Sequence, residues 1–357
     1  MRFEKIKLDD VRYEAASAVD INGDGLLDIV CGEYWYEAPN WTKHKMCDVQ
    51  SEGEYYDDFS DIPMDVNGDG YPDIVTGGWW GLELRWRENP GGRPVEWVVH
   101  SIAEVGSIET TRAWDIDGDG ELEIVPNTPG MPQTIFKLNR DSAGKPAGSF
   151  TKWVISEGAS GHGLGFGDIN GDGRGDVILA GGWLEAPEDP YGGLWTWHPE
   201  FNLGSASVPV IVHDVNGDGL ADLIVGQAHD YGLHWWEQGR DASGNRVWTP
   251  HEIDMTVSQY HDMQLADLDN DGELELVTGK RYRAHCGNDP GEFDPIGVYY
   301  FKLGGGRFEK HVIDYGHAPD ASGVGIYFWL ADLSGNGRLD IIAPGKDGLY
   351  LFINHPD

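Results

Sequence analysis

The chain is poor in several kinds of residue, and each shortage excludes a class of protein. Lysine and arginine together number 25 against 61 aspartate and glutamate residues, so the formal net charge is −36. Nucleic-acid binding requires an excess of basic side chains, so a nucleic-acid partner is excluded. No apolar run approaches the roughly 20 residues of a membrane span, and no membrane partner is expected.

Cysteine is also scarce. Cys31, Cys47 and Cys286 are an odd number at no metal-ligand spacing, which indicates free thiols in a reducing compartment and not a disulfide framework. Residues 1–8 alternate polar and apolar side chains and lack the apolar core of a signal peptide, so they predict a strand. We therefore expect a cytoplasmic protein, with secretion left open for a processed precursor. The sequence leaves the oligomeric state open.

Helical periodicity is missing as well: no window repeats apolar residues at the spacing of a helix face. Glycine is abundant instead, at 51 residues, beside 15 Trp, 15 Tyr and 11 Phe. Glycine-rich turns between aromatic strands predict an all-β fold.

The feature that organises the chain is an acidic turn followed by a short apolar run. It is clearest at residues 267–277, DLDNDGELELV, and recurs seven times, beginning at Asp20, Asp65, Asp115, Asp168, Asp214, Asp267 and Asp332. The copies begin 45 to 65 residues apart, and repetition at such an interval is typical of repeat folds. Because the copies run from end to end, we predict a single domain over residues 1–357.

Each repeat has room for four strands, with the acidic turn joining the first and the second. Seven such units predict a seven-bladed β-propeller of four-stranded blades. After the last turn only two further strands fit, so the last blade lacks its outer strand. Residues 2–8 resemble residues 307–313, an outer strand of the sixth repeat. We expect the N-terminal strand to complete the last blade and close the ring.

Oxygen ligands at alternate positions of a tight turn suit Ca²⁺ or Mg²⁺. Asx-turns without metal are the alternative interpretation. The seventh copy, with Ser334 and Asn336, is the one expected to be empty. The predicted structural ligands in the other six copies are Asp20, Asn22, Asp24, Asp28, Asp65, Asn67, Asp69, Asp73, Asp115, Asp117, Asp119, Glu123, Asp168, Asn170, Asp172, Asp176, Asp214, Asn216, Asp218, Asp222, Asp267, Asp269, Asp271 and Glu275.

The opposite face of the propeller is where we expect chemistry. The position six residues before each acidic turn rings the central channel and holds Glu14, Phe59, Glu109, His162, Val208, His261 and Ile326. The loops between second and third strands add His229 and His285 to the same mouth. Three neutral imidazoles predict a site for Zn²⁺ or another divalent transition metal. A hydrogen-bonded sugar or anion site is the alternative.

Three segments carry a resemblance to a known family: GHGLGFGDINGDGR at 161–174, AHDYGLHWWEQ at 228–238 and YHDMQLADLD at 260–269, which GKRYRAHCGNDPGE follows at 279–292. The acidic turns resemble FG-GAP or VCBS repeats. The three segments resemble the propeller domain of aldos-2-ulose dehydratase (1,5-anhydro-D-fructose dehydratase), whose members carry Zn²⁺ in a propeller cleft and act on keto-sugars. The resemblance implies metal ligation by His162, His229 and His261, with His285 as an alternative ligand or a substrate contact. Characterised members add cupin domains that have no counterpart here.

The hypothesis is a metal-dependent lyase or dehydratase that carries out β-elimination on a small keto-sugar such as 1,5-anhydro-D-fructose, an aldos-2-ulose or a 3-keto-glycoside. A base removes the proton of the acidified C–H, and the oxygen on the β-carbon leaves as water or as an alcohol. His285, Tyr260 or Glu109 is the candidate base. Lys280 or Arg281 is expected to stabilise the enolate. The expected substrate contacts are Tyr282, Trp183 and Asp230.

Two other functions stay open. A calcium-stabilised sugar-binding or scaffold propeller would need no catalytic metal. A polysaccharide lyase acting on uronates would need a cationic groove, for which Arg112 and the cluster of Lys280, Arg281 and Arg283 are the visible supply.

Overall fold

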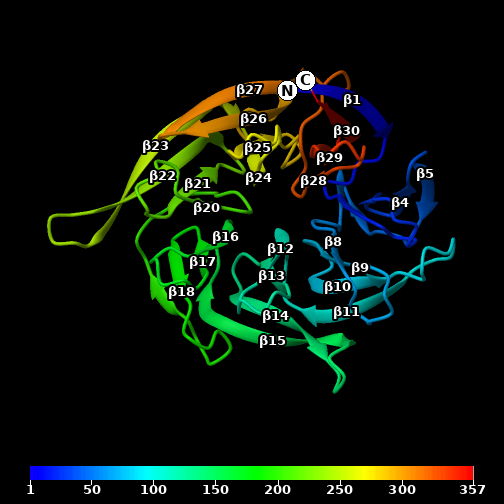
Figure 1. The fold of residues 1–357 in the computed structure, drawn as a ribbon, viewed down its shortest axis with the longest axis horizontal. Coiled ribbons are helices and arrows are strands. Elements are labelled where there is room, and N and C mark those ends of the chain that lie inside the picture. Colours follow the sequence, from blue (N-terminus) through cyan, green and yellow to red (C-terminus); the bar gives the residue numbers. More distant parts are fainter. Residues whose placement is uncertain (357) are drawn as a thin grey trace.

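The computed structural model describes residues 1–356 as a closed ring of seven four-stranded antiparallel β-sheets (Figure 1). The predicted all-β, seven-bladed propeller is confirmed. Within the described range no helix is long and apolar enough to cross a membrane.

Each acidic turn joins the first and second strands of a blade, as the sequence predicts. Blades 1 to 3 consist of β2 (Ser17–Val19), β3 (Asp28–Cys31), β4 (Tyr34–Glu37) and β5 (Thr42–Lys45); β8 (Ile62–Met64), β9 (Asp73–Gly77), β10 (Glu83–Glu88) and β11 (Val98–Glu104); and β12 (Thr110–Trp114), β13 (Glu123–Asn127), β14 (Pro132–Arg140) and β15 (Pro146–Ala159).

Blades 4 to 6 continue the same order around the ring. They consist of β16 (Leu164–Gly167), β17 (Asp176–Leu179), β18 (Gly182–Glu185) and β19 (Thr196–His198); β20 (Ile211–His213), β21 (Asp222–Gly226), β22 (Tyr231–Arg240) and β23 (Arg246–Ser258); and β24 (Tyr260–Ala266), β25 (Glu275–Lys280), β26 (Ile296–Gly304) and β27 (Arg307–Gly316).

The seventh blade joins the two ends of the chain. Its strands are β28 (Trp329–Ala331), β29 (Asp340–Gly345), β30 (Gly348–His355) and, as the outer strand, β1 (Arg2–Asp9). Strand β1 runs antiparallel to β30, with Ile6 opposite Leu351. Figure 1 shows the two termini side by side at this blade. The predicted closure by the N-terminal strand is confirmed, and it covers the edge that β30 would otherwise expose.

The hydrophobic core lies between neighbouring blades. One cluster joins Ile29 of blade 1 to Ile342 of blade 7, and another joins Ile62 of blade 2 to Phe136 of blade 3. These side chains are 0 to 2% exposed. Each blade therefore buries its two faces against its neighbours, and its first strand lies nearest the central channel.

The last carboxylate of each acidic turn fastens the blade together. Asp28 Oδ2 accepts the backbone N–H of Ile21 at 3.0 Å, and Oδ1 accepts that of Ala38 at 2.8 Å, so one side chain joins the turn to the third strand. The N–H equivalent to that of Ile21 is accepted by Asp73, Glu123, Asp176, Asp222, Glu275 and Asp340. The turns are therefore Asx-type structures closed by backbone N–H groups.

One element has no counterpart in the predicted repeat. A hairpin of β6 (Ser51–Glu52) and β7 (Tyr55–Tyr56) is inserted between blades 1 and 2. The Tyr55 hydroxyl donates to the carbonyl of Ala284 at 2.8 Å, and Glu54 pairs with Arg283 at 2.7 Å. The hairpin thus contacts the loop of residues 281–295, between β25 and β26.

Candidate metal centre

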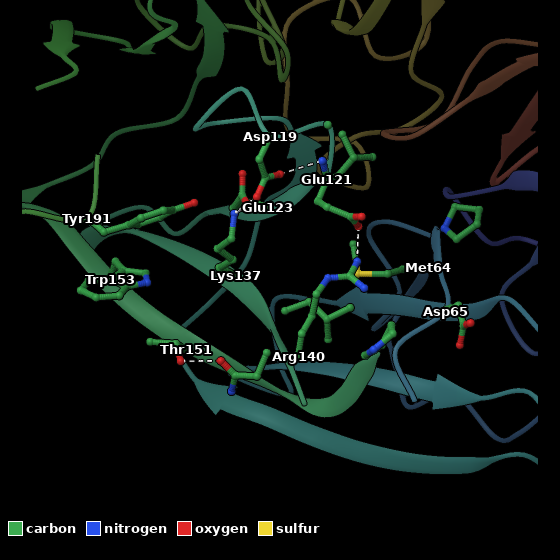
Figure 2. A pocket seen from close by; sticks show the side chains of 16 residues that line it. Met64, Asp65, Asp119, Glu121, Glu123, Lys137, Arg140, Thr151, Trp153 and Tyr191 are labelled. Atoms are coloured by element: carbon green, nitrogen blue, oxygen red, sulfur yellow. Dashed lines mark hydrogen bonds and ion pairs between the residues drawn. The ribbon is translucent and has the colours of Figure 1, made fainter. Parts of the chain in front are cut away.

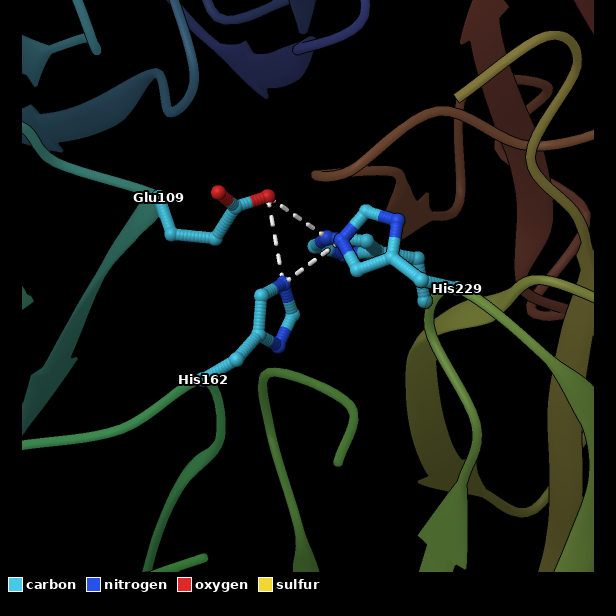
Figure 3. Close-up of side chains that lie close together, drawn as sticks. Glu109, His162 and His229 are labelled. Atoms are coloured by element: carbon cyan, nitrogen blue, oxygen red, sulfur yellow. Dashed lines mark hydrogen bonds and ion pairs between the residues drawn. The ribbon is translucent and has the colours of Figure 1, made fainter. Parts of the chain in front are cut away.

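Three histidines and one glutamate meet at the channel mouth. Glu109 lies just before β12 and His162 just before β16, while His261 is on β24 and His229 is in the turn between β21 and β22. One ligand atom from each lies within 4.8 Å of the other three. Figure 3 shows Glu109, His162 and His229 pointing toward one another from separate blades. The structure therefore brings together the three histidines to which the sequence assigns a metal.

The hydrogen bonds around the histidines fix which nitrogen faces the centre. His162 Nδ1 lies 2.7 Å from the carbonyl oxygen of Ala206, and His229 Nδ1 lies 2.9 Å from Asp289 Oδ2. Because both partners only accept, each Nδ1 carries a proton, and in a neutral imidazole Nε2 is then the nitrogen with the lone pair. The two Nε2 atoms are 3.0 Å apart. Two lone pairs at that distance repel unless a cation or a proton lies between them.

Glu109 adds an anionic oxygen to the same point. Its Oε1 lies 3.0 Å from His261 Nε2 and 3.3 Å from His162 Nε2. Burial alone would raise the pKa of Glu109, but His162 and His261 outweigh burial and hold it well below its usual range. Burial lowers the pKa of His229 and, more strongly, of the fully buried His261. The lowered pKa values of His229 and His261 favour two neutral imidazoles, and that of Glu109 favours an ionised carboxylate; a divalent transition metal requires ligands in these states.

Asp289 connects this centre to a fourth histidine. Its Oδ1 lies 2.8 Å from His285 Nδ1, while its Oδ2 holds His229. The His229 and His285 rings stack with centroids 4.0 Å apart and an interplanar angle of 2°. A carboxylate behind a metal-ligating histidine fixes its tautomer and raises its basicity. The same carboxylate leaves His285 Nε2 free to accept a proton.

A cavity of about 200 Å³ opens beside the centre. Glu109, Arg281 and His285 form its polar side. The remainder of the lining is aromatic and consists of Tyr55, Phe59, Trp79 and Trp80. An aromatic wall facing a few polar groups is typical of a site for a small ligand with an apolar face, such as a sugar ring.

The two cations near the cavity are already paired. Arg281 Nε lies 2.8 Å from Glu14 Oε1, and Arg281 Nη1 lies 3.6 Å from Glu109. Lys346 Nζ lies 2.9 Å from Glu14 Oε2 and 4.3 Å from the centre of the Tyr55 ring. These two cations and two carboxylates sum to zero charge. Arg281 therefore lies at the site, where the sequence predicts a residue that stabilises negative charge. Its own positive charge is balanced by Glu14 and Glu109.

Two residues predicted for catalysis lie elsewhere. Tyr260 is fully buried between blades 5 and 6, and its hydroxyl donates to Asp254 at 2.7 Å. Lys280 is fully buried and donates to the carbonyl of Gly291 at 2.6 Å, so it supports the loop of residues 281–295 from behind. Side chains of consecutive strand residues point to opposite sides, so the residues next to His261 and Arg281 face away from the channel.

The predicted substrate contacts are not among the residues that line the cavity. Trp183 is 1% exposed, on β18, and stacks on His198 with ring centroids 4.2 Å apart. Asp230 is exposed, and its carboxylate accepts the N–H of Tyr231. Tyr282 is half-buried. Within residues 1–356, none of Trp183, Asp230 and Tyr282 lines this cavity.

Several groups at the site were not assigned by the sequence. Asp289 was missed, although it stands four residues after His285. Tyr55 lies on an insertion outside the repeat, so no register could place it. Trp79 and Trp80 also line the cavity.

The acidic turns differ in how well they fit a divalent cation. In blades 1, 4 and 5 the third-position amide donates to the fifth-position carboxylate at 3.0 to 3.3 Å, and in blade 4 Arg174 also pairs with that carboxylate, Asp172. In blade 3, Lys137 Nζ lies 2.5 Å from Asp117, 2.8 Å from Asp119 and 2.9 Å from Glu123. In blade 6, Lys302 occupies the corresponding place. The calcium ligands predicted in these two blades therefore surround a lysine.

Comparison with known proteins identifies the repeat and the fold. The FG-GAP-like repeat family matches residues 65–125 and 214–278. No curated protein sequence matches the chain. BBS1N, in crystals of its complex with ARL6DN soaked with mercury, is 12% identical over 99% of this chain and 97% of its own, with a TM-score of 0.54.

Two further solved structures are similar to the chain. The lead-soaked form of the BBS1N complex gives 12% identity, coverage of 97% and 93%, and a TM-score of 0.51. The Vibrio cholerae biofilm matrix protein Bap1 is 19% identical over 80% of this chain and 38% of its own, with a TM-score of 0.32. These likenesses concern the fold alone. The chain is a seven-bladed propeller that contains FG-GAP-like repeats.

Proposed function

We propose that the protein is a metal-dependent lyase that carries out β-elimination on a small, neutral keto-sugar. The observation that carries the proposal is the pair of histidine Nε2 atoms 3.0 Å apart, with a buried carboxylate beside them, at the edge of an aromatic cavity. The resemblance that we draw from residues 161–174, 228–238, 260–269 and 279–292 to the aldos-2-ulose dehydratase propeller is our reason for choosing this reaction class.

The residues of the centre suit a transition metal. His162, His229 and His261 would hold it together with Glu109, which is the mixture of imidazole and carboxylate donors that Zn²⁺ accepts. When bound, such an ion supplies Lewis-acid polarisation of a ketone oxygen and so acidifies the neighbouring C–H.

His285 is the base that the geometry favours. It lines the cavity, and its side chain is 49% exposed, so a substrate can reach Nε2. Asp289 holds the proton on Nδ1, so Nε2 is the atom that takes the proton from carbon. Glu109 faces the histidines of the centre, which makes it a ligand in preference to a base. Arg281 borders the cavity, where it can stabilise the enolate oxygen.

The charge around the cavity favours a neutral substrate over a uronate. Arg281 and Lys346 are each paired with a carboxylate, so neither is free to bind the carboxylate of a uronate. The four aromatic residues of the wall would contact the apolar face of a sugar ring. For these reasons we favour a keto-sugar dehydratase over a polysaccharide lyase.

The test is a reaction of the zinc-loaded protein with 1,5-anhydro-D-fructose and with 3-keto-glucosides, followed by absorbance of the conjugated enone. We expect product from at least one class, and a rate about 10²- to 10⁴-fold lower in His285→Ala, as for loss of a general base. His251→Ala is the control, because His251 stacks on Trp235 in the outer part of blade 5. Absence of product with both classes would overturn the proposal. Sugar binding without product would favour a binding propeller.

A further inference from the structure

Two of the acidic turns contain a lysine where their carboxylates converge. Figure 2 shows Lys137 extending from β14 toward Asp119 and Glu123, at the border of a cavity of about 710 Å³. Its Nζ lies 2.5 to 2.9 Å from three carboxylates. Lys302 on β26 makes contacts of 2.7 to 3.5 Å with Asp269, Asp271 and Glu275. The ammonium thus lies among carboxylates that could also hold a metal ion, which are Asp115, Asp117 and Glu123 in blade 3 and Asp267, Asp269 and Asp271 in blade 6.

The repeats supply an internal comparison for this arrangement. Three positions change together: the third and ninth residues of the turn, and the third-strand residue beside the ninth. In blade 3 these residues are Asp117, Glu123 and Lys137, and in blade 6 they are Asp269, Glu275 and Lys302. Blades 1, 2, 4 and 5 combine Asn22, Asp28 and Glu37; Asn67, Asp73 and Glu88; Asn170, Asp176 and Glu185; or Asn216, Asp222 and Glu237.

The hydrogen bonds explain why the three positions change together. Where the third strand carries lysine, its ammonium is bonded to the third- and ninth-position carboxylates. Where the third strand carries glutamate, as in blade 4, the Asn170 amide donates to Glu185 at 3.2 Å. An aspartate at position 170 would face Glu185 with a like charge and no donor between them. Aspartate at the third position of the turn therefore needs lysine on the third strand, and the lysine needs this aspartate.

We propose that Lys137 and Lys302 are built-in cations that replace the divalent ion in the turns of blades 3 and 6, so that these two blades are held together without metal. The inference does not depend on the proposed function, because both turns lie on the face opposite the histidines. It assigns calcium binding, where it occurs, to the turns that lack a lysine.

The test compares Lys137→Gln, Lys302→Gln and the double variant with the wild-type protein, and uses Ca²⁺ alone as the probe. Glutamine keeps most of the side-chain volume and removes the charge, which leaves the carboxylates of the turn open to calcium. We expect each single variant to bind about one more Ca²⁺ per chain by calorimetry, and the double variant about two more. Each variant should melt at a lower temperature in chelator and recover with calcium. Lys152→Gln, an exposed lysine on β15, is the matched control and should change neither quantity.

A crystal of the wild-type protein grown in calcium gives a second measurement that does not depend on the variants folding. Lysine density between the carboxylates, without an anomalous calcium peak, supports the proposal. Calcium peaks in blades 3 and 6 with the lysines displaced would overturn it. Variants that fold and bind no more calcium than the wild type would also overturn it.

Discussion

At the scale of single residues, Asp289 links the two halves of the candidate site. It accepts from His229, a predicted metal ligand, and from His285, the proposed base. In Asp289→Asn only one amide oxygen is left to accept, so one of the two imidazoles loses its partner. We expect transition-metal affinity about 10- to 100-fold weaker, the usual effect of losing such a supporting group. Competition with a chromophoric chelator measures it.

The control for this variant is Asp230→Asn on the neighbouring loop, an exposed aspartate that does not border the cavity. Its metal affinity and melting temperature should equal those of the wild type. An Asp289→Asn protein that binds zinc as tightly as the wild type would show that Asp289 has no positioning role.

At the scale of elements, strand β1 determines whether the ring is closed. Deleting residues 2–8 would expose the whole of β30 as an unpaired edge and remove the partner of Leu351. We expect a lower melting temperature and concentration-dependent aggregation by light scattering, since an open edge pairs with other chains. Lys5→Ala is the control: it removes the ion pair with Asp314, the hydrogen bond to the Asp320 carbonyl and the contact with the Tyr350 ring, but it leaves the backbone of β1 paired with β30. A truncated protein that stays monomeric with an unchanged melting temperature would contradict the role of β1.

The elements also show how far the sequence could predict the site. The repeated turn gave the register, so counting back along the inner strand reached Glu109, His162 and His261, which the structure brings together. The same counting could not tell whether a residue next to His261 also faces the channel. Side chains alternate along a strand, so Tyr260 points into the core instead. Asp289 and Tyr55 lie on a long loop and an insertion, where no repeat fixes a register.

At the scale of the whole molecule, the carboxylates should make stability depend on pH. Burial raises the pKa of Asp28 to about 6, of Asp73 to about 7 and of Asp176 to about 6, from an ordinary value of 3.8. Between about pH 4 and 7 the folded state therefore binds protons that the unfolded state has released. The free energy of unfolding then falls as pH rises through this window. The net charge of −36 acts in the same direction.

In the presence of a chelator, we expect a higher melting temperature at pH 5.5 than at pH 7.5, as measured by calorimetry, since the buried carboxyl groups are more fully protonated at the lower pH. Calcium should reduce the difference, because a bound cation offsets the charge at neutral pH. A melting temperature that rises from pH 5.5 to 7.5 in chelator would contradict this view of the acidic turns.

The central claim is that the histidine and glutamate side chains at the channel mouth bind one transition-metal ion. Elemental analysis of the protein after exposure to zinc and calcium, followed by gel filtration, tests it most directly. The account predicts about one zinc per chain in the wild type and in His251→Ala, and none in His261→Ala, because a catalytic site of this kind holds a single ion. A wild-type protein that carries calcium alone, or a His261→Ala variant that keeps its zinc, would contradict it.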